Sequence, residues 1–543
     1  MLWIGLHLPL LSLETVACLP GFGGDASVAG PAGADVALAI VDAHHIVHVN
    51  QAGQALGVRP AMKRATALAL APQLVLAQAD AARDALALQA VGHAALTFTP
   101  MVCLLMPGAT SKTTAQTAPQ TVLLEVQASL RYFRGFESLL QRLKAALQPL
   151  GHRLQIASAP TAQAATLLCR LAARNRDGEL HCADLAQTMR CLDAAPVGLL
   201  AAAAEHLDAL EAIGLRQIGE LRRLPRAGLA RRFGQALLDE IDRAFGRCPD
   251  PRQPISLPPQ FSSRLELLAR ADSTEQVLYG ARVLLNRLVV WALAHQARVG
   301  RFSLQMLHET RHRSDAQTPP ASELEIALTE ASCDADHLQL LLRERLAQVR
   351  LAAPTLELRL SCPELVHRPP PNGELFPTAR NEKEGLTRLI ERLQARLGGA
   401  QVQRLVRVED HRPERASITQ PFDGQWAASS RQRSTAPVDG GVGVPLQQPV
   451  WLMLQPEPLI ERQRQPLLDG RPLQLLCGPE RIETGWWDAA LAERDYFIAQ
   501  AGDGSLVWIY RGRLPPREAV ETDGAVVPAV DRQSGWFLHG RFA

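Results

Sequence analysis

The chain has 543 residues, enough for about three or four domains of ordinary size, and 47% of them are hydrophobic, which suffices for several cores. Its formal net charge of only +2 excludes a protein that is basic throughout, so any contact with nucleic acid must come from a local patch. Its nine cysteines form no CxxC pair, which excludes a zinc ribbon or a disulfide framework and indicates the reduced thiols of a cytoplasmic protein.

The N-terminal run 1–13 is apolar, but no Lys or Arg precedes Arg59, so a buried strand is favoured over a signal peptide. The apolar stretch 277–294 is interrupted by Arg282 and Arg287, which argues against a membrane-spanning helix. The sequence therefore predicts a cytoplasmic protein with no membrane contact.

Residues 1–180 alternate strand-type and helix-type patterns, which predicts an α+β domain with a small lobe inserted at about 42–95. The predicted strands are 36–41, 46–49, 121–127 and 154–158, and the predicted helices are 61–70, 137–147 and 162–174.

The N-terminal strand resembles the first catalytic strand of the Y-family translesion DNA polymerases, which bears an Asp-x-Asp followed by a Glu. Glu14 matches that glutamate, and counting back places Gly5 and His7 at the two aspartates. The second acidic signature of the family, an Asp-Glu pair, falls on Gln120 and Thr121. Two-metal catalysis needs anionic oxygens to hold two Mg²⁺ ions, so the resemblance implies that metal binding, and with it polymerase activity, is lost here.

Four further positions of the resemblance have also lost the family's residue. Gln51 and Gln54 stand in the segment whose Tyr and Arg grip the triphosphate, and Ala162 stands near the phosphate-binding Lys. Leu10 falls at the aromatic that excludes ribonucleotides. The resemblance thus implies a palm (1–180) with inserted fingers that serve as a scaffold, with no cofactor and no metal.

The segment 181–254 is helical and basic, and its centre resembles a helix-hairpin-helix in which a glycine turn presents backbone N–H groups to a DNA phosphate. The resemblance places the thumb of the family here. An ordinary amphipathic hairpin with solvated arginines remains the alternative. The predicted DNA-binding residues are Gly214, Arg216, Gly219, Arg222, Arg223, Arg226, Arg231 and Arg232.

Residues 255–410 alternate strands and helices again, in the manner of the family's α/β little finger, a small sheet that lies on the duplex backbone. The predicted strands are 264–271, 298–308 and 355–361, and the predicted helices are 274–294, 335–348 and 384–397.

A proline-bounded peptide follows the last of these strands and resembles the extended Gln-x-x-Leu-Phe peptides that bacterial sliding clamps bind. Its residues at 372–376 place Leu375 and Phe376 at the two buried positions and Asn372 at the Gln position. The alternative is that the Leu-Phe pair packs on its own domain.

The stretch 411–446 lacks periodicity and predicts a flexible linker, after which 447–543 forms an aromatic-rich, β-rich module. Exposed aromatic residues are frequent anchors at protein interfaces, although most aromatics of a small domain are core. We predict that the module binds protein partners through Trp486, Trp487, Trp508 and Trp536.

The sequences GPERIE, GWW, RDYF and GWFLHG of this module resemble the ImuB family, catalytically degenerate Y-family (UmuC/DinB-like) homologues of bacterial mutagenesis cassettes. The resemblance spans essentially the whole chain. It implies a noncatalytic DNA-binding scaffold, induced in the SOS response, for translesion synthesis and mutagenesis. The implied partners are DNA, the bacterial sliding clamp, the RecA-like protein ImuA and the error-prone replicative-type DNA polymerase of the same cassette.

The predicted fold is α+β and multidomain: a Y-family-like palm and fingers, a helix-hairpin-helix thumb, an α/β little finger and a small β-rich C-terminal domain. Three alternatives stay open on function. The chain could be an active Y-family polymerase with displaced metal ligands, for example Glu125 with Asp42 and His45. It could also be a DNA-binding module without a clamp role, or an interaction protein that never touches DNA.

Overall fold

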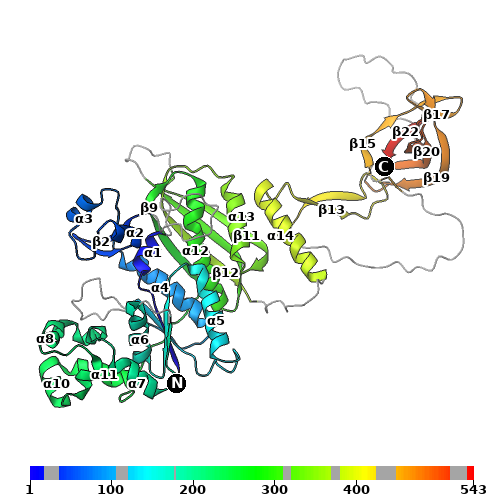
Figure 1. Cartoon of the computed structure of the whole chain (residues 1–543). Coiled ribbons are helices and arrows are strands. Elements are labelled where there is room, and N and C mark those ends of the chain that lie inside the picture. Colours follow the sequence, from blue (N-terminus) through cyan, green and yellow to red (C-terminus); the bar gives the residue numbers. More distant parts are fainter. Residues whose placement is uncertain are drawn as a thin grey trace. The chain divides into compact units, whose positions relative to one another are not determined.

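A computed structural model describes residues 1–17, 36–105, 120–175, 179–309, 319–367, 379–422, 448–449, 451–488, 490–513 and 535–542. The chain forms two compact units, Met1–Arg396 and Leu397–Ala543, and each is considered by itself (Figure 1).

The N-terminal sheet of the first unit has the strand order β5-β6-β1-β7-β8, with the N-terminal strand β1 in the centre. Strand β1 pairs antiparallel with both β6 and β7, which confirms that the apolar N-terminus is a buried strand. The strands are β1 (Trp3–His7), β5 (Val102–Leu105), β6 (Thr121–Glu125), β7 (Gln155–Ala159) and β8 (Glu179–His181).

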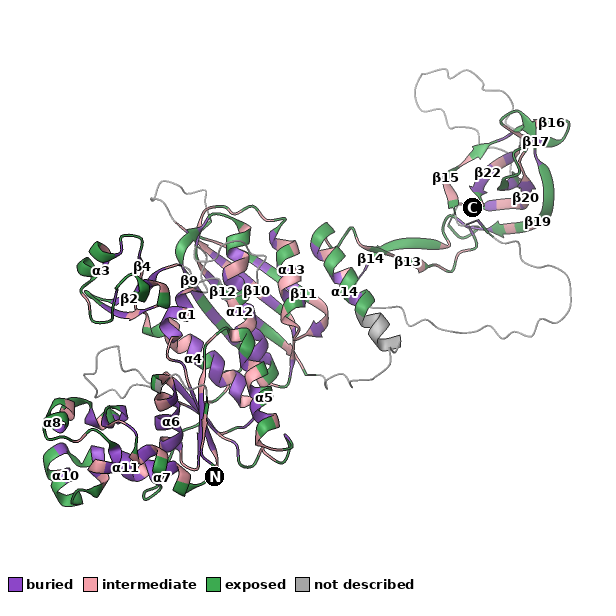
Figure 2. Ribbon diagram, viewed as in Figure 1, coloured by how far each residue is buried: buried purple, intermediate pink, exposed green. Residues whose placement is uncertain are grey.

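Helices cover both faces of this sheet. Successive side chains of a strand point to opposite faces, so Ile4 and Leu6 enter one core and Trp3 enters another. The core with Ile4 includes residues of α4 (Ala81–Leu96) and α5 (Phe136–Leu147). The core with Trp3 includes residues of α6 (Ala162–Asn175) and continues into the helical segment that follows. The buried sheet between the helices is purple in Figure 2.

The inserted lobe is a three-stranded sheet of order β3-β2-β4 with two short helices and its own small core. Asn50 fixes its first turn, because the Asn50 side chain accepts hydrogen bonds from the backbone N–H groups of Gly53 and Leu38 and so caps a helix while joining it to the sheet. The elements are β2 (Leu38–Asp42), β3 (His45–Val49), α2 (Gln51–Ala55), α3 (Arg64–Leu70) and β4 (Val75–Gln78).

The segment after β8 is all helical, as the sequence predicts, and its buried residues join the core beneath α6. Glu240 fastens it internally, because its carboxylate accepts hydrogen bonds from the backbone N–H groups of Ala201 and Ala202. The main helices are α7 (Leu185–Asp193), α8 (Leu207–Ala212), α9 (Ile218–Arg223), α10 (Arg226–Phe233) and α11 (Gln235–Ala244).

The next domain is a four-stranded antiparallel sheet of order β11-β10-β12-β9, with helices packed on one face. In the part of the chain that the structure describes, α12 is the one helix that is long and apolar enough to cross a membrane, but most of it is buried in this domain's core. The elements are β9 (Phe261–Ala271), α12 (Thr274–Ala294), β10 (Arg298–His308), β11 (Ala321–Ser332), α13 (Ala335–Leu346) and β12 (Thr355–Val366).

A further helix, α14 (Ala379–Leu397), is fixed to this domain by the buried carboxylate of Glu391. Glu391 lies 2.8 Å from the ring of His337 and accepts hydrogen bonds from the backbone N–H groups of Thr329 and Glu330 on β11. The carboxylate therefore joins α14 to both α13 and the sheet.

The second unit is built of strands. A five-stranded antiparallel sheet has the order β15-β22-β21-β20-β19, beside a three-stranded sheet of β16 to β18 and a separate hairpin of β13 and β14. The main strands are β13 (Gln403–Arg407), β14 (Ser417–Pro421), β15 (Trp451–Pro458), β19 (Gln474–Thr484), β20 (Ala492–Gln500), β21 (Leu506–Gly512) and β22 (Trp536–Arg541), and the smaller sheet consists of β16 (Ile460–Arg462), β17 (Gln465–Leu468) and β18 (Arg471–Pro472).

The predicted α+β multidomain fold with a β-rich C-terminal domain is confirmed. One difference concerns the expected linker. Residues 411–422, at the beginning of the stretch predicted as flexible, include strand β14 and hold several side-chain contacts to the C-terminal sheet.

Candidate catalytic remnant and candidate interfaces

His7 and Thr121 lie directly opposite each other where β1 pairs with β6. The ring nitrogen Nδ1 of His7 and the hydroxyl of Thr121 are 3.1 Å apart and form a hydrogen bond. Burial, with a smaller contribution from the charge of Arg170, lowers the pKa of His7 to about 4. The imidazole is therefore neutral at neutral pH, and this strand pair presents two uncharged, mutually bonded side chains.

Gly5 occupies a position at which the backbone of α6 approaches β1 closely. A Cβ atom added to Gly5 would lie 2.7 Å from the carbonyl oxygen of Ala165 and 3.1 Å from Sγ of Cys169. The first distance is well inside van der Waals contact with backbone, so even alanine would force the helix and strand apart. A carboxylate side chain has no room at Gly5.

Gln120, just before β6, is also part of a local hydrogen-bond chain. Its amide donates to the hydroxyl of Ser12 at 3.2 Å, and Ser12 donates to the carboxylate of Asp84 on α4. Thr15 donates to the same carboxylate at 3.3 Å. Asp84 is the acidic residue of this hydrogen-bonded group, and its carboxylate already accepts hydrogen bonds from the hydroxyls of Ser12 and Thr15.

The displaced ligand set Glu125, Asp42 and His45 is not brought together. The carboxylate of Glu125 accepts hydrogen bonds from the backbone N–H groups of Leu2 and Gln127, while Asp42 and His45 lie on paired strands of the inserted lobe. Within the described ranges, no group of three or more His, Cys, Asp and Glu side chains is arranged to hold a metal ion.

Two of the predicted thumb arginines have partners within the fold. Arg222 forms a bidentate pair with Asp193, at 2.9 and 2.5 Å, and its guanidinium lies 4.9 Å from the ring centre of Phe245. Arg226 forms a bidentate pair with Asp242, and this pair lowers the pKa of Asp242. Arg222 and Arg226 therefore join helices within the fold, and their contact with DNA stays a prediction.

Gly219 also has a packing role. It is buried in α9, and a Cβ atom there would lie 2.8 Å from the carbonyl oxygen of Asp193. The glycine lets α9 pack closely on the end of α7, and it does not face solvent.

The backbone N–H groups before α9 are occupied by the protein itself. The carboxylate of Glu220 accepts hydrogen bonds from the N–H groups of Arg216 and Gln217, at 2.7 and 2.9 Å, and Ile218 donates to the carbonyl of Ala195. The predicted phosphate site at this turn is therefore filled by a carboxylate. A Glu three residues after a polar helix cap is a recognisable capping signal, and it was present in the sequence.

Gly214 keeps its predicted role as a turn residue, with φ of +84° and open space around it. Four arginines of this helical segment are exposed and form no ion pair with a described residue: Arg216, Arg223, Arg231 and Arg232. Arg232 lies 5.4 Å from the ring centre of Phe233, and the charges of Arg223 and Arg216 add to the backbone hydrogen bonds that lower the pKa of Glu220. These four guanidinium groups form the candidate nucleic-acid interface.

The candidate clamp-binding residues Asn372, Leu375 and Phe376 lie outside the described residues.

The four tryptophans predicted to bind partners fall into two classes. Trp508 is fully buried and stacks on Tyr496 with ring centres 4.1 Å apart, and Trp536 is 5% exposed in the adjoining core. The prediction that these two anchor a partner is wrong, because both are core residues. In contrast, Trp486 is 79% exposed and Trp487 is 54% exposed.

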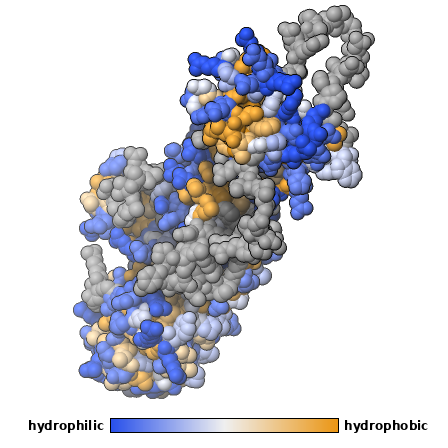
Figure 3. Space-filling model, turned by 90° about the vertical axis from the view of Figure 1, so that its right-hand side faces the viewer, coloured by the Kyte–Doolittle hydropathy of each residue, from blue (hydrophilic) through white to orange (hydrophobic). Residues whose placement is uncertain are grey.

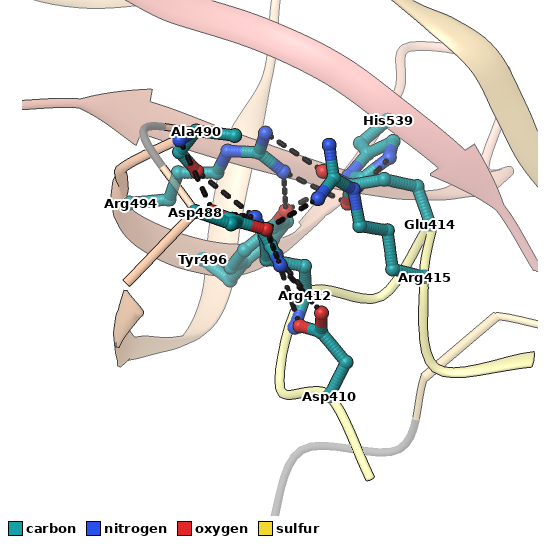
Figure 4. A network of polar contacts seen from close by, with 9 residues as sticks. All are labelled: Asp410, Arg412, Glu414, Arg415, Asp488, Ala490, Arg494, Tyr496 and His539. Atoms are coloured by element: carbon teal, nitrogen blue, oxygen red, sulfur yellow. Dashed lines mark hydrogen bonds and ion pairs between the residues drawn. The ribbon is translucent and has the colours of Figure 1, made fainter. Parts of the chain in front are cut away.

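Arg412 is the residue that sequence reasoning missed, since it lies in the predicted linker. Its guanidinium donates to the carboxylates of Asp410 and Asp488 and to the carbonyl oxygen of Ala490 (Figure 4). Only 3% of its side chain is exposed. Arg415 donates to the same Asp488 at 2.7 Å. The segment 410–415, called the strap below, is thus bound to the loop between β19 and β20 by hydrogen bonds and ion pairs.

The same strap also reaches the aromatic core through Glu414. Arg494 on β20 donates to Glu414 and to the hydroxyl of Tyr496, and that hydroxyl lies 2.8 Å from Nδ1 of the buried His539 (Figure 4). Burial raises the pKa of Tyr496 and lowers the pKa of His539. The RDYF and FLHG sequences therefore supply parts of one internal network.

No family model matches the chain. The chain is 28% identical over 520 residues to Protein ImuB of two strains of Caulobacter vibrioides, covering 90% of this chain and 100% of that protein. A ternary complex of Dbh is 13% identical, with a TM-score of 0.37 and coverage of 67% of this chain and 99% of that one. DinB from Sulfolobus solfataricus is 12% identical, with a TM-score of 0.35 and the same coverages. The predicted resemblance to ImuB is confirmed.

Proposed function

We propose that this ImuB-like chain is a noncatalytic, DNA-binding scaffold of translesion synthesis and mutagenesis in the SOS response. It brings together the sliding clamp, the RecA-like protein ImuA and an error-prone polymerase that adds the nucleotides. It acts in the cytoplasm. The observation that carries the proposal is the strand pair at His7 and Thr121, where two bonded neutral side chains stand in the centre of the sheet.

Three features near this pair support the absence of nucleotide addition. The backbone of α6 leaves no space for a side chain at Gly5, and the amide of Gln120 donates a hydrogen bond to Ser12. His7 is neutral at working pH, because its pKa is lowered to about 4. Holding two divalent cations against a triphosphate requires several anionic oxygens in one place, and Gly5, His7, Gln120 and Thr121 carry no carboxylate.

The DNA-binding part of the proposal rests on the exposed arginines Arg216, Arg223, Arg231 and Arg232, which form no ion pair with a described residue. Their guanidinium groups are exposed, and each can neutralise a phosphate. Since the turn amides are already bonded to Glu220, the contact is made by side chains and is independent of base sequence. The chain then binds DNA with a pronounced salt dependence.

The partner contacts are proposed for two regions. The peptide with Leu375 and Phe376 binds the sliding clamp, and the C-terminal unit binds the protein partners of the cassette. An exposed tryptophan pair in a small β domain supports the second assignment.

Reconstituted primer extension tests the whole proposal. The chain alone is expected to add no nucleotide to a primed template, and to stimulate extension past a lesion when clamp, ImuA and cassette polymerase are present. Substitution of Leu375 and Phe376 by alanine is expected to abolish the clamp-dependent part of the stimulation. Extension by the chain alone that disappears in Glu125→Ala would favour the alternative, an active polymerase with displaced ligands.

A further inference from the structure

The loop between β19 and β20 exposes two adjacent tryptophans. Trp486 and Trp487 are 79% and 54% exposed, and their rings meet edge to face with centres 5.4 Å apart. Large exposed aromatic surface costs free energy in water, so it is usually present at a place where a partner covers it. On the hydropathy scale of Figure 3 tryptophan is close to neutral, so the orange residues on the C-terminal unit in that view are other apolar side chains.

The described residues of this loop make several contacts that hold the backbone beside the tryptophans. Gly485 begins the loop with φ of +85°, and a Cβ atom there would lie 2.4 Å from the carbonyl oxygen of Ala490, so only glycine closes the turn. The carboxylate of Asp488 accepts the backbone N–H of Ala490, and Arg412 donates to both Asp488 and the Ala490 carbonyl. Hydrogen bonds on the C-terminal side of Trp486 and Trp487 therefore fix the turn that carries them.

Arg412 also supports the tryptophans directly. Its guanidinium carbon lies 5.8 Å from the ring centre of Trp487, at a distance where the cation and the aromatic ring attract each other. Asp410 and Asp488 both accept hydrogen bonds from the guanidinium of Arg412, so the cation beside the Trp487 ring is held in place. Preorganised aromatic anchors lose little conformational entropy on binding.

The charges around the loop favour a protein partner over nucleic acid. Five arginines of the C-terminal unit are each paired with a carboxylate: Arg412 and Arg415 with Asp488, Arg481 with Asp495, Arg494 with Glu414, and Arg513 with Glu483. Binding a nucleic-acid strand by base stacking also requires cations that neutralise its phosphates. Here those cations are neutralised by the domain's own acids.

The two edges of the C-terminal sheet are poor alternatives for a partner. Strand β19 is interrupted by register shifts on both sides of Cys477 and contains Pro479, and strand β15 contains Pro456 and Pro458. Prolines and bulges remove the regular hydrogen-bonding edge that an added strand would need. A partner is therefore expected to bind the side chains of the Trp486–Trp487 loop and not to add a strand to the sheet.

We propose that the Trp486–Trp487 loop, positioned by Arg412, is the anchor with which the C-terminal unit enters an apolar pocket of a folded protein partner. This inference rests on the proposed scaffold function and makes it specific. It also places a positioning residue, Arg412, outside the module 447–543 that the sequence predicted.

The test measures equilibrium binding of the full chain to purified ImuA and to purified cassette polymerase, and separately to a fluorescent oligothymidylate strand. The variant Trp486→Ala/Trp487→Ala is expected to weaken binding to one of the two proteins by tenfold or more, the order of a hot-spot loss, and to leave oligothymidylate binding unchanged. The matched control is Trp451→Ala, because Trp451 is 71% exposed in the same unit. This variant is expected to leave binding to both proteins and to oligothymidylate unchanged.

Arg412→Ala and Arg412→Lys test the positioning role in a double-mutant cycle. Each is expected to weaken protein binding in the wild-type background and to have no further effect when both tryptophans are alanine. A loss that persists in the double-alanine background means that Arg412 acts only on the fold, and it overturns the positioning role.

The remaining outcomes are also decisive. Unchanged protein binding in Trp486→Ala/Trp487→Ala overturns the anchor and leaves the scaffold function standing. Loss of oligothymidylate binding alone overturns it in favour of a stacking platform for single strands. Failure of the wild-type chain to bind either protein contradicts the scaffold function itself.

Discussion

The helical segment 181–254, which the sequence predicts to be a thumb, and the C-terminal unit both contain many arginines, but these arginines differ in their partners. In the helical segment 181–254 the structure leaves Arg216, Arg223, Arg231 and Arg232 exposed and without an ion pair among the described residues. In the C-terminal unit, Arg412, Arg481 and Arg513 are paired with carboxylates, while Trp486 and Trp487 are exposed. The number of arginines in a sequence does not show which of them are paired with an acidic side chain, because that depends on the fold.

The largest effect is expected for Trp508→Ala compared with Trp486→Ala. Trp508 is fully buried and Trp486 is 79% exposed. Removing the buried side chain should lower the free energy of unfolding by about 3–5 kcal/mol, and removing the exposed one should change it by less than about 0.5 kcal/mol. Chemical denaturation of the fragment 397–543, followed by circular dichroism, gives both values. Equal effects would mean that the exposed pair is part of the core.

The free thumb arginines should control DNA affinity. In Arg231→Ala/Arg232→Ala, the slope of log affinity against log salt concentration is expected to fall by about 2, because each phosphate contact contributes about 1. Thermal stability should stay the same, since neither side chain has an internal ion pair in the described structure. Fluorescence anisotropy over a salt series measures the slope, and an unchanged slope would remove the thumb from the DNA interface.

Arg222→Ala is the matched change at a paired arginine. Its bidentate contact to Asp193 is partly exposed, so the loss of stability should be about 1 kcal/mol or less. The salt slope of DNA binding should be unchanged, in contrast to Arg231→Ala/Arg232→Ala. A reduced slope for Arg222→Ala would show that this guanidinium leaves Asp193 to bind DNA.

The smallest effect is expected from Glu220, and it depends on pH. Hydrogen bonds from the backbone N–H groups of Gln217 and Arg216 lower the pKa of Glu220 below its usual value of 4.5. A lowered folded-state pKa means that the carboxylate stabilises the fold above pH 4.5 and that this contribution is lost as pH falls through the folded value. Glu220→Gln should therefore have a lower melting temperature than wild type at neutral pH, with the difference shrinking below pH 4.5. A difference in melting temperature that stays constant across this pH range would contradict the stabilising role of the Glu220 carboxylate at the start of α9.

Periodicity and motif spacing were sufficient for most of the fold. The strands at 298–308 and 355–361 and the helix at 274–294 match β10, β12 and α12, because long amphipathic or alternating runs dominate local structure. Strand β11 was not predicted. The predicted linker also missed β14 and the Arg412 strap, since an ion-paired segment has no apolar period to reveal it.

The site residues were harder to predict, for a physical reason. Sequence shows that Arg222 and Arg226 are basic, but only the fold shows that Asp193 and Asp242 neutralise them. It shows that Trp508 and Trp486 are aromatic, but not that one is core and the other is exposed. The acidic partners lie 29 and 16 residues from Arg222 and Arg226, so only the folded chain brings each pair together.

The central claim is that the palm is a scaffold without nucleotide chemistry. Single-turnover incorporation of a deoxynucleotide by the chain alone, at high protein concentration on primed DNA with Mg²⁺, tests it most directly. The His7–Thr121 pair and the closed position of Gly5 predict no incorporation above a protein-free control, together with salt-dependent DNA binding in the same sample. Template-directed incorporation that disappears in Glu125→Ala would contradict the account.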